Sequence, residues 1–219
     1  MKDRYSIVVG LLFLILVAVA TLNTLTDGGG EGTLGLDRQA DRWPLPEFAV
    51  PDVSGRLEGD ANVAQDDCES SALPCPGDAV RDPACEITTA GAIRVCDLFD
   101  RPLVISFWFT KGGDCEAQQD VVDRVYRRYR GRVNFLSIDI HDDPETVREL
   151  ASQRGWELPV GYDRDGAVGS LYGVGVCPTF AYAYPGGTLQ ATSIGEIGQG
   201  QLTAEVESLL AATREAEVG

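Results

Sequence analysis

Histidine and basic side chains are scarce in this chain of 219 residues. The sequence has one histidine, and 18 lysine and arginine residues stand against 34 acidic residues, which gives a formal net charge of −16. An acidic surface repels the phosphates of nucleic acids, and no basic stripe is visible, so we expect no nucleic-acid partner. His141 stands beside Asp142 and Asp143 after an expected strand, where a solvated loop histidine is a better interpretation than a catalytic base.

Charged residues are also absent from a stretch near the N-terminus. Residues 7–22 form an almost unbroken apolar run, slightly shorter than the roughly 17–25 residues of a membrane-spanning helix. Lys2 and Arg4 precede the run, so the positive-inside rule predicts a cytoplasmic N-terminus and an extracytoplasmic domain. We predict a single-pass anchor in the cell membrane over residues 1–25. A cleaved signal peptide is the alternative, because Ala-Val-Ala at 18–20 resembles a cleavage site.

Cysteines follow only after this apolar run, and there are six of them: Cys68, Cys75, Cys85, Cys96, Cys115 and Cys177. An even number of cysteines outside the cytoplasm indicates disulfides. Proximity in the sequence favours structural disulfides Cys68–Cys75 and Cys85–Cys96, which leaves Cys115 and Cys177 as a pair. Zinc binding by the first four cysteines is the alternative, but their spacings suit a metal poorly and the histidine lies far away in sequence. We therefore expect no metal and no cofactor.

Glycine and polar residues separate the apolar run from the rest of the chain. Residues 26–42 are predicted to form a flexible linker, and residues 43–213 a single domain. Within that domain, residues 54–90 are rich in Cys, Pro, Asp and Gly and show neither a strand period nor a helix period. A structureless stretch of this length is unusual in a compact domain. Two local disulfides would keep the insert ordered, and a partner-binding loop is the other interpretation.

Strand and helix patterns alternate after the insert. The continuous apolar run at 103–109 is typical of a central strand buried on both faces, and residues 115–130 carry the pattern of an amphipathic helix. This order predicts an α/β sandwich with a mixed central sheet flanked by helices. The domain is expected to start with a short strand within residues 43–50. The other expected strands are 92–97, 133–140, 159–162, 179–184 and 188–194, and the other expected helices are 142–154, 167–172 and one around 202–210.

The motifs, in this order, resemble the thioredoxin superfamily, and in particular the membrane-anchored TlpA/ResA-like branch of extracytoplasmic thiol-disulfide oxidoreductases. Residues 101–108 resemble the strand that leads to the active site. Residues 142–160 resemble the helix and strand that this branch inserts, and residues 162–174 resemble its next turn and helix. Cys-Pro-Thr-Phe at 177–180 resembles the cis-proline loop. The similarity covers roughly residues 44–212 apart from the insert.

The active-site motif departs from the family pattern. The superfamily's Trp-Cys-x-x-Cys falls on the segment that ends at Cys115, so Gly112 replaces the nucleophilic cysteine and Cys115 retains the resolving one. Ser106 stands where thioredoxins carry a buried aspartate. The residue before the expected cis-proline, Pro178, is Cys177. The usual exchange between two neighbouring cysteines therefore cannot be transferred to this chain.

Cys115 and Cys177 are the candidate catalytic residues, with either one as the attacking thiolate. Cys115 is expected at the start of a helix with Lys111 before it, and both features lower the pKa of a thiol. The resemblance implies that the cis-proline loop packs against the active-site motif, which brings the two cysteines within disulfide range. They could form a redox-active pair, a permanent disulfide or two unpaired buried thiols. The expected substrate groove consists of Lys111, Gly112, Val176 and Pro178.

The predicted function is that of a membrane-tethered, extracytoplasmic thioredoxin-like thiol-disulfide oxidoreductase. Its expected partners are exported proteins with thiols or disulfides, and a membrane thiol electron donor is a further candidate. A non-catalytic thioredoxin-fold binding or scaffolding module, with structural disulfides only, is the alternative. A thiol peroxidase is less favoured, because Thr110 lies farther from Cys115 than the peroxiredoxin pattern requires.

Overall fold

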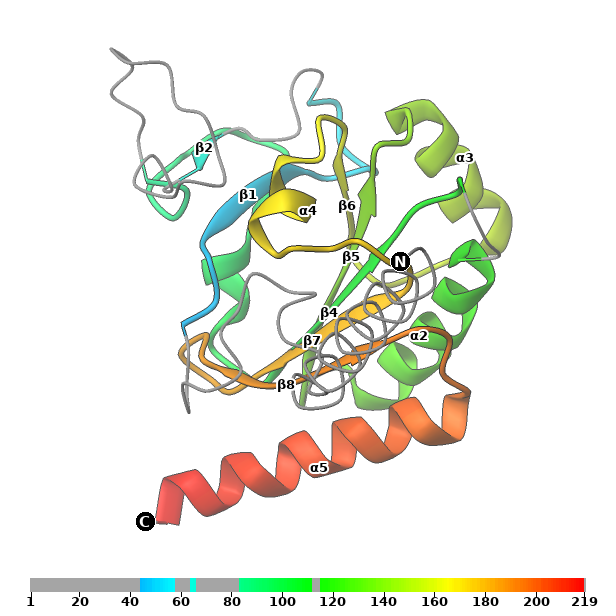
Figure 1. Cartoon of the computed structure of the whole chain (residues 1–219). Helices are drawn as coiled ribbons and strands as arrows, with labels where there is room; N and C mark the ends of the chain where they lie inside the picture. Colours follow the sequence, from blue (N-terminus) through cyan, green and yellow to red (C-terminus); the bar gives the residue numbers. More distant parts are fainter. Residues whose placement is uncertain (1–43, 58–63, 66–82, 112–114, 219) are drawn as a thin grey trace, which may run out of the picture. The chain divides into compact units, whose positions relative to one another are not determined.

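The computed structural model describes residues 44–57, 64–65, 83–111 and 115–218 (Figure 1). The chain divides into two compact units, Met1–Gly32 and Thr33–Gly219, and all described residues belong to the second. The predicted anchor and linker, Gly112, Cys68 and Cys75 lie outside the described residues. Within the described part, no helix combines the length and the apolar character that a membrane crossing requires.

A mixed five-stranded sheet forms the centre of the described unit (Figure 1). Its strand order is β6-β5-β4-β7-β8. The central strand β4 is parallel to β5, which is parallel to β6, whereas β7 runs antiparallel to both β4 and β8. The expected α/β architecture with a mixed sheet is confirmed. The bounds are β4 Leu103–Trp108, β5 Asn134–Ile140, β6 Val160–Asp163, β7 Thr179–Ala183 and β8 Leu189–Ile194.

Helices cover the sheet on both faces. The helices are α2 Cys115–Tyr129, α3 Pro144–Arg154, α4 Ala167–Leu171 and α5 Gln199–Val218. Side chains of β4 alternate between two cores: Val104 and Trp108 pack with α2, α3 and α5, whereas Ile105 and Phe107 pack with α4 and the N-terminal strand β1. All six residues of β4 are buried, as its continuous apolar run predicted.

The last helix is longer than expected. The sequence indicated a helix around 202–210, but α5 continues to Val218. Residues 211–218 contain alanine, glutamate and arginine, which favour the helix, and neither glycine nor proline interrupts them. The apolar contacts of α5 end near Leu209 and Leu210. A helix predicted from the spacing of apolar residues therefore ends there as well.

A small three-stranded sheet lies beside the main one, with order β2-β1-β3. Its strands are β1 Phe48–Pro51, β2 Ala64–Gln65 and β3 Ala92–Arg94. The insert was expected to contain no strand, but β2 pairs antiparallel with β1. Two residues are too few to produce a visible period. The strand expected at 92–97 is also shorter, because the chain turns at Val95 into the 3-10 helix η1, Val95–Leu98.

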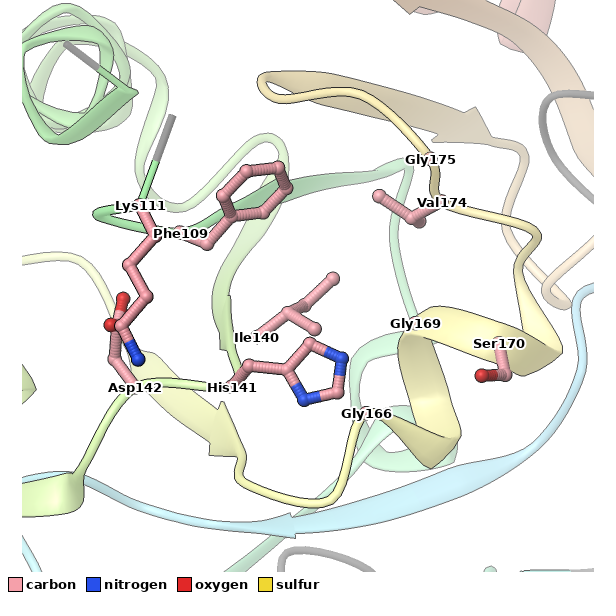
Figure 2. Close-up of a pocket in the computed structure, with 10 residues that line it drawn as sticks. All are labelled: Phe109, Lys111, Ile140, His141, Asp142, Gly166, Gly169, Ser170, Val174 and Gly175. Carbon is pink, nitrogen blue, oxygen red and sulfur yellow. The ribbon is translucent and has the colours of Figure 1, made fainter. Parts of the chain in front are cut away.

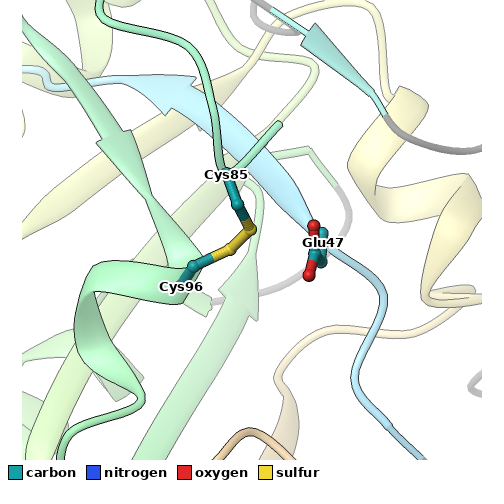
Figure 3. Close-up of side chains that lie close together, drawn as sticks. All are labelled: Glu47, Cys85 and Cys96. Atoms are coloured by element: carbon teal, nitrogen blue, oxygen red, sulfur yellow. A yellow bond between two sulfur atoms is a disulfide. The ribbon is translucent and has the colours of Figure 1, made fainter. Parts of the chain in front are cut away.

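A disulfide between Cys85 and Cys96 joins the described end of the insert to η1, with the Cα atoms 5.8 Å apart (Figure 3). Arg94 reinforces this link by donating hydrogen bonds to the carbonyl oxygens of Cys85 and Ile87 at 3.0 and 3.1 Å. Its guanidinium also pairs with Asp97 at 2.7 Å. The local disulfide therefore fixes the start of the regular domain.

Candidate functional site

The structure joins Cys115 to Cys177 by a disulfide, with their Cα atoms 6.0 Å apart. Cys115 is the first residue of α2. Cys177 directly precedes Pro178, and the peptide bond between them is cis, as the resemblance implied. The two cysteines are 62 positions apart in the sequence, so the bond links the start of α2 to the loop before β7.

The two cysteines differ in their access to solvent. Cys115 is 2% exposed and belongs to the core between the sheet and α2. Cys177 is half-buried, and its Sγ lies 3.8 Å from the carbonyl oxygen of Phe109. Its neighbour Val176 is 46% exposed. A molecule approaching from solvent therefore meets the Cys177 side of the disulfide before the Cys115 side.

Backbone and side-chain hydrogen bonds hold the cis-proline loop against the sheet. Gly195 donates its N–H to the carbonyl oxygen of Pro178 at 2.8 Å, and the Thr179 hydroxyl donates to the carbonyl oxygen of Val176. Thr179 pairs in register with Ile194 of β8. Val176 and Ile194 are the exposed large apolar side chains among the described residues. Val176 precedes the cis peptide bond and Ile194 pairs with Thr179, whereas Pro178 itself is buried.

A buried network of neutral polar groups lies beneath the start of α2. Trp108 donates its indole N–H to Ser137 Oγ at 2.8 Å, and Ser137 donates to Gln119 Oε1 at 3.0 Å. Gln119 in turn donates to Ser106 Oγ at 3.0 Å. Ser106 and Ser137 are cross-strand partners of β4 and β5. The position of the usual thioredoxin aspartate is thus occupied by a satisfied neutral hydroxyl. The sequence analysis missed Gln119 and Ser137. They could have been noticed as polar residues at positions where the pattern of the helix or strand requires a buried side chain.

Carboxylic acids gather at the ends of β5 and β6. Asp142 accepts hydrogen bonds from the backbone N–H and the hydroxyl of Thr110, both at 2.7 Å. Its own N–H donates to Asp139 Oδ1 at 3.2 Å. Burial, together with the nearby Asp142 charge, raises the pKa of Asp139 to about 9. Asp139 is therefore protonated at neutral pH.

Asp163 is a second buried carboxyl group in this cluster. Burial raises its pKa to about 7, although Gly169 donates a backbone N–H to Asp163 Oδ2 at 2.7 Å and opposes the rise. One oxygen of Asp163 and one of Asp139 are buried and make no hydrogen bond. Unpartnered buried carboxyl oxygens favour the neutral acid, because the charged form would lose its hydration without compensation.

A cavity of about 310 Å³ opens beside these acids (Figure 2). His141 forms part of its wall with a backbone φ of +71°, a conformation that is rare outside glycine. The His141 N–H donates to the carbonyl oxygen of Asp163 at 3.0 Å, and its ring lies against Gly166. The lining residues are Phe109, Lys111, Ile140, His141, Asp142, Gly166, Gly169, Ser170, Val174 and Gly175.

The residues of the predicted groove lie in different surroundings, and Gly112 is outside the described residues. Lys111 lines the cavity and is exposed, whereas Val176 is exposed on the cis-proline loop. Sequence reasoning did not place Phe109 or His141 at the site. His141 is exposed, as a loop histidine should be, but it also forms a cavity wall. In the sequence, only its position directly after the end of β5 could have indicated this.

Metal-binding side chains come together at one place in the described residues: Glu47, Cys85 and Cys96, whose ligand atoms lie within 4.8 Å of one another (Figure 3). The two sulfur atoms are joined in a disulfide. Zinc is bound by cysteine as the thiolate, so this arrangement does not offer a metal site while the disulfide is intact.

Comparisons with known proteins find similarity to thiol-disulfide oxidoreductases. No family model matches it. Thiol-disulfide oxidoreductase ResA of Oceanobacillus iheyensis is 26% identical over 112 residues, which are 51% of this chain and 56% of that protein. The ResA of Bacillus thuringiensis is 27% identical over 111 residues, 50% of this chain and 64% of the relative. The chain thus spans less than two thirds of the length of these relatives.

Solved structures resemble the described fold over most of their length. A DsbF homologue from Corynebacterium diphtheriae superposes with a TM-score of 0.56 at 15% identity, covering 83% of this chain and 95% of that one. A putative thioredoxin from Neisseria meningitidis gives a TM-score of 0.54 at 22% identity, covering 78% and 92%. The fold is thioredoxin-like, and the expected resemblance to the TlpA/ResA-like branch of the superfamily is confirmed by the ResA relatives.

Proposed function

We propose that this chain is a thiol-disulfide oxidoreductase whose reactive group is the Cys115–Cys177 disulfide. The main support is the position of that bond, which joins the first residue of α2 to the residue before a cis-proline and has one accessible side. The similarity to ResA proteins, named as thiol-disulfide oxidoreductases, supports the same reaction class. The site has no Cys-x-x-Cys motif, so two cysteines that are distant in sequence carry out the exchange reaction.

The exposure difference assigns separate roles to the two sulfur atoms. A partner thiolate attacks the half-buried Cys177 Sγ, the bond to Cys115 Sγ breaks, and its electron pair stays on Cys115 as a thiolate. A thiolate at the N-terminus of a helix is stabilised by the helix dipole, which makes Cys115 the better leaving group. A second thiolate of the partner then attacks the partner sulfur of the mixed disulfide, so the partner leaves with its own disulfide and Cys177 is released as a thiolate. In the reverse direction, the reduced pair passes two electrons to a partner disulfide.

The partners in this proposal are exported proteins with thiols or disulfides. An extended polypeptide can pair with the backbone at the cis-proline loop, and the exposed Val176 and Ile194 offer apolar contacts on either side of Pro178. A membrane thiol electron donor would restore the reactive state. Anchoring of residues 1–25 in the membrane, with the domain outside, belongs to the same proposal and rests on the sequence.

One observation favours the second candidate function, a non-catalytic binding module. Cys115 is almost fully buried and packs in the core with Trp108, as a permanent disulfide would. A bond across 62 positions would stabilise the fold by about 4 kcal/mol through the entropy of the unfolded chain. A structural disulfide of this kind stays closed at thiol concentrations that reduce a redox-active disulfide.

The two functions differ in how easily the bond opens. The full chain should be equilibrated with a series of thiol buffers, alkylated in denaturant, and its disulfides mapped by peptide mass spectrometry. The Cys85–Cys96 disulfide serves as an internal control. We expect Cys115–Cys177 to open under milder reduction than the control bond. If the two bonds open together, the oxidoreductase proposal is wrong and the binding module takes its place.

A further inference from the structure

The cavity of about 310 Å³ lies next to the disulfide, on the side of Phe109 and Gly175. Phe109 lines it and holds its carbonyl oxygen 3.8 Å from Cys177 Sγ. Gly175, on the opposite wall, shortly precedes Cys177 in the chain. Neither cysteine lines the cavity, so a bound molecule reaches towards Cys177 Sγ across the edge formed by Phe109 and Gly175. The cis-proline loop and its apolar border remain free for a polypeptide.

The cavity has a size and a lining that suit a small molecule. Ligand sites usually measure about 300–1,000 Å³ and combine apolar walls with a few placed polar groups. The apolar walls here are Phe109, Ile140 and Val174, and the polar groups are Lys111, His141, Asp142 and Ser170. Figure 2 shows Lys111 and Asp142 on one side and Ser170 on the other, with His141 and Ile140 between them.

The charges at the cavity favour a negatively charged group. Lys111 is exposed at its edge and makes no ion pair with any of the described residues. Asp142 also lines the cavity, but both of its carboxylate oxygens accept hydrogen bonds from Thr110. The amino group of Lys111 is thus the available charged donor, and it suits a carboxylate. The whole chain has a net charge of −16, so it offers an anion few other cationic groups.

We propose that this cavity binds a low-molecular-weight thiol that carries a carboxylate. The carboxylate pairs with Lys111, and the sulfur points to Cys177 Sγ. The inference rests on the proposed exchange reaction and names one partner for it: the small thiol acts as the electron donor of the site. Ser170 and His141 supply further polar contacts at the wall, and Phe109 and Val174 contact the carbon chain of the ligand.

The reaction balances with two molecules of thiol. The first, as a thiolate, forms a mixed disulfide with Cys177 and releases Cys115 as a thiolate. The second thiolate attacks the sulfur of the bound thiol, so a small-molecule disulfide leaves and Cys177 also becomes a thiolate. The two protons of the thiols end on Cys115 and Cys177. The protein disulfide gains two electrons, and the two thiols lose them.

Three small thiols of similar length, which differ in charge, test the charge preference. Mercaptopropionate is anionic, mercaptoethanol is neutral and cysteamine is cationic. The rate of opening of Cys115–Cys177 is measured for each by alkylation and mass spectrometry. It is divided by the thiolate concentration and by the rate of the same thiolate with a small-molecule disulfide, because the three thiols differ in pKa and in nucleophilicity. We expect mercaptopropionate to react about 2- to 5-fold faster than mercaptoethanol, the gain of one exposed ion pair, and the advantage to shrink at high salt.

Variants of Lys111 connect the preference to the cavity. Lys111→Gln should abolish the advantage of mercaptopropionate, and Lys111→Arg should keep it. Arg101→Gln is the matched control: Arg101 is exposed and lies before β4, at the end of the strand away from the disulfide, so its loss should leave the ratio unchanged.

The outcomes separate this inference from the proposed function. If the disulfide resists all three thiols under mild reduction, the exchange reaction itself is wrong. If it opens with all three at equal corrected rates, or if Lys111→Gln retains the preference, exchange stands and the anion site is overturned. A preference for cysteamine would also overturn it, and would indicate that Asp142 dominates the field in the cavity.

Discussion

Asp142 receives two hydrogen bonds from Thr110, one from the backbone N–H and one from the hydroxyl, each 2.7 Å long. This contact ties the segment after β5 to the segment that leads from β4 towards Cys115. Phe109 directly precedes Thr110, and its carbonyl oxygen lies 3.8 Å from Cys177 Sγ. The position of the disulfide therefore depends on a carboxylate that belongs to neither cysteine's own segment.

Replacing Asp142 by alanine should destabilise the domain and loosen the segment that carries Phe109. Hydrogen bonds to a charged group contribute about 1.5–3 kcal/mol. Urea unfolding measures the change. Asp143→Ala is the matched control, because its side chain is 75% exposed and its contact with Arg164 is 3.9 Å long; it should change the free energy of unfolding by about 0.5 kcal/mol or less. Equal effects of the two variants would contradict the role given to Thr110.

Serine variants of the two cysteines should give different products with a disulfide-bonded peptide. Cys115→Ser leaves Cys177 half-buried and without its resolving partner, so a mixed disulfide on Cys177 should accumulate. Cys177→Ser leaves Cys115, which is 2% exposed in the native protein, and trapping should fall by about tenfold or more, because thiol exchange requires access to the sulfur. Mass spectrometry of the unreduced adducts measures both.

The opposite trapping result would contradict the roles assigned to the two cysteines. If Cys177→Ser accumulates the adduct and Cys115→Ser does not, the roles of the two cysteines are reversed. The far-UV circular dichroism of each variant reports whether it is folded. If both variants are folded and neither traps the peptide, the result favours the non-catalytic module.

Stability should fall as the pH rises, because two carboxyl groups hold protons in the folded state. The pKa of Asp139 is raised from 3.8 to about 9, and that of Asp163 to about 7. The unfolded chain loses these protons near pH 4, whereas the folded protein keeps them. Their stabilising contribution is therefore complete below about pH 4 and is lost as the pH rises to the folded pKa values. Each proton adds a slope of about −1.4 kcal/mol per pH unit within its window.

Asp139→Asn isolates one of these protons. The amide cannot ionise, so the slope of unfolding free energy against pH between about 5 and 8 should become less negative than in the wild type. Glu149→Gln is a useful control, because Glu149 is exposed on α3 and is not among the groups that shift the pKa of Asp139 or Asp163. An unchanged slope in Asp139→Asn would mean that Asp139 is ionised in the folded protein. Urea titrations at a series of pH values provide the slopes.

The sequence predicted the parts of the site that local pattern and resemblance determine. Three of these parts are visible within a few residues of sequence: the apolar run of β4, the helix that begins at Cys115 and the proline after Cys177. The proton on Asp139 cannot be predicted in this way, because it depends on burial between two strands and on Asp142. The network of Gln119 and Ser137 likewise depends on the register of β4 against β5. A polar residue inside an apolar pattern shows that a partner exists, but not which one.

The cavity wall at Gly166 provides the last prediction. Gly166 has a φ of +73°, and a Cβ there would lie 2.0 Å from Cε1 of His141. Gly131 has a φ of +87°, and a Cβ there would meet nothing within 4 Å. Gly131→Ala should therefore cost only the backbone strain of about 1–2 kcal/mol, and Gly166→Ala should cost more, because the imidazole must also move.

The double variant Gly166→Ala, His141→Ala tests whether the imidazole is the cause. Removing the ring should return the cost of the alanine at 166 to that of Gly131→Ala, which is a coupling between two contacting residues. Unfolding free energies of the single and double variants measure it. If Gly166→Ala costs no more than Gly131→Ala, the ring of His141 moves freely and does not form a fixed wall. The cavity would then be wider in solution, and recognition of a small thiol would depend on Lys111 and Phe109 alone.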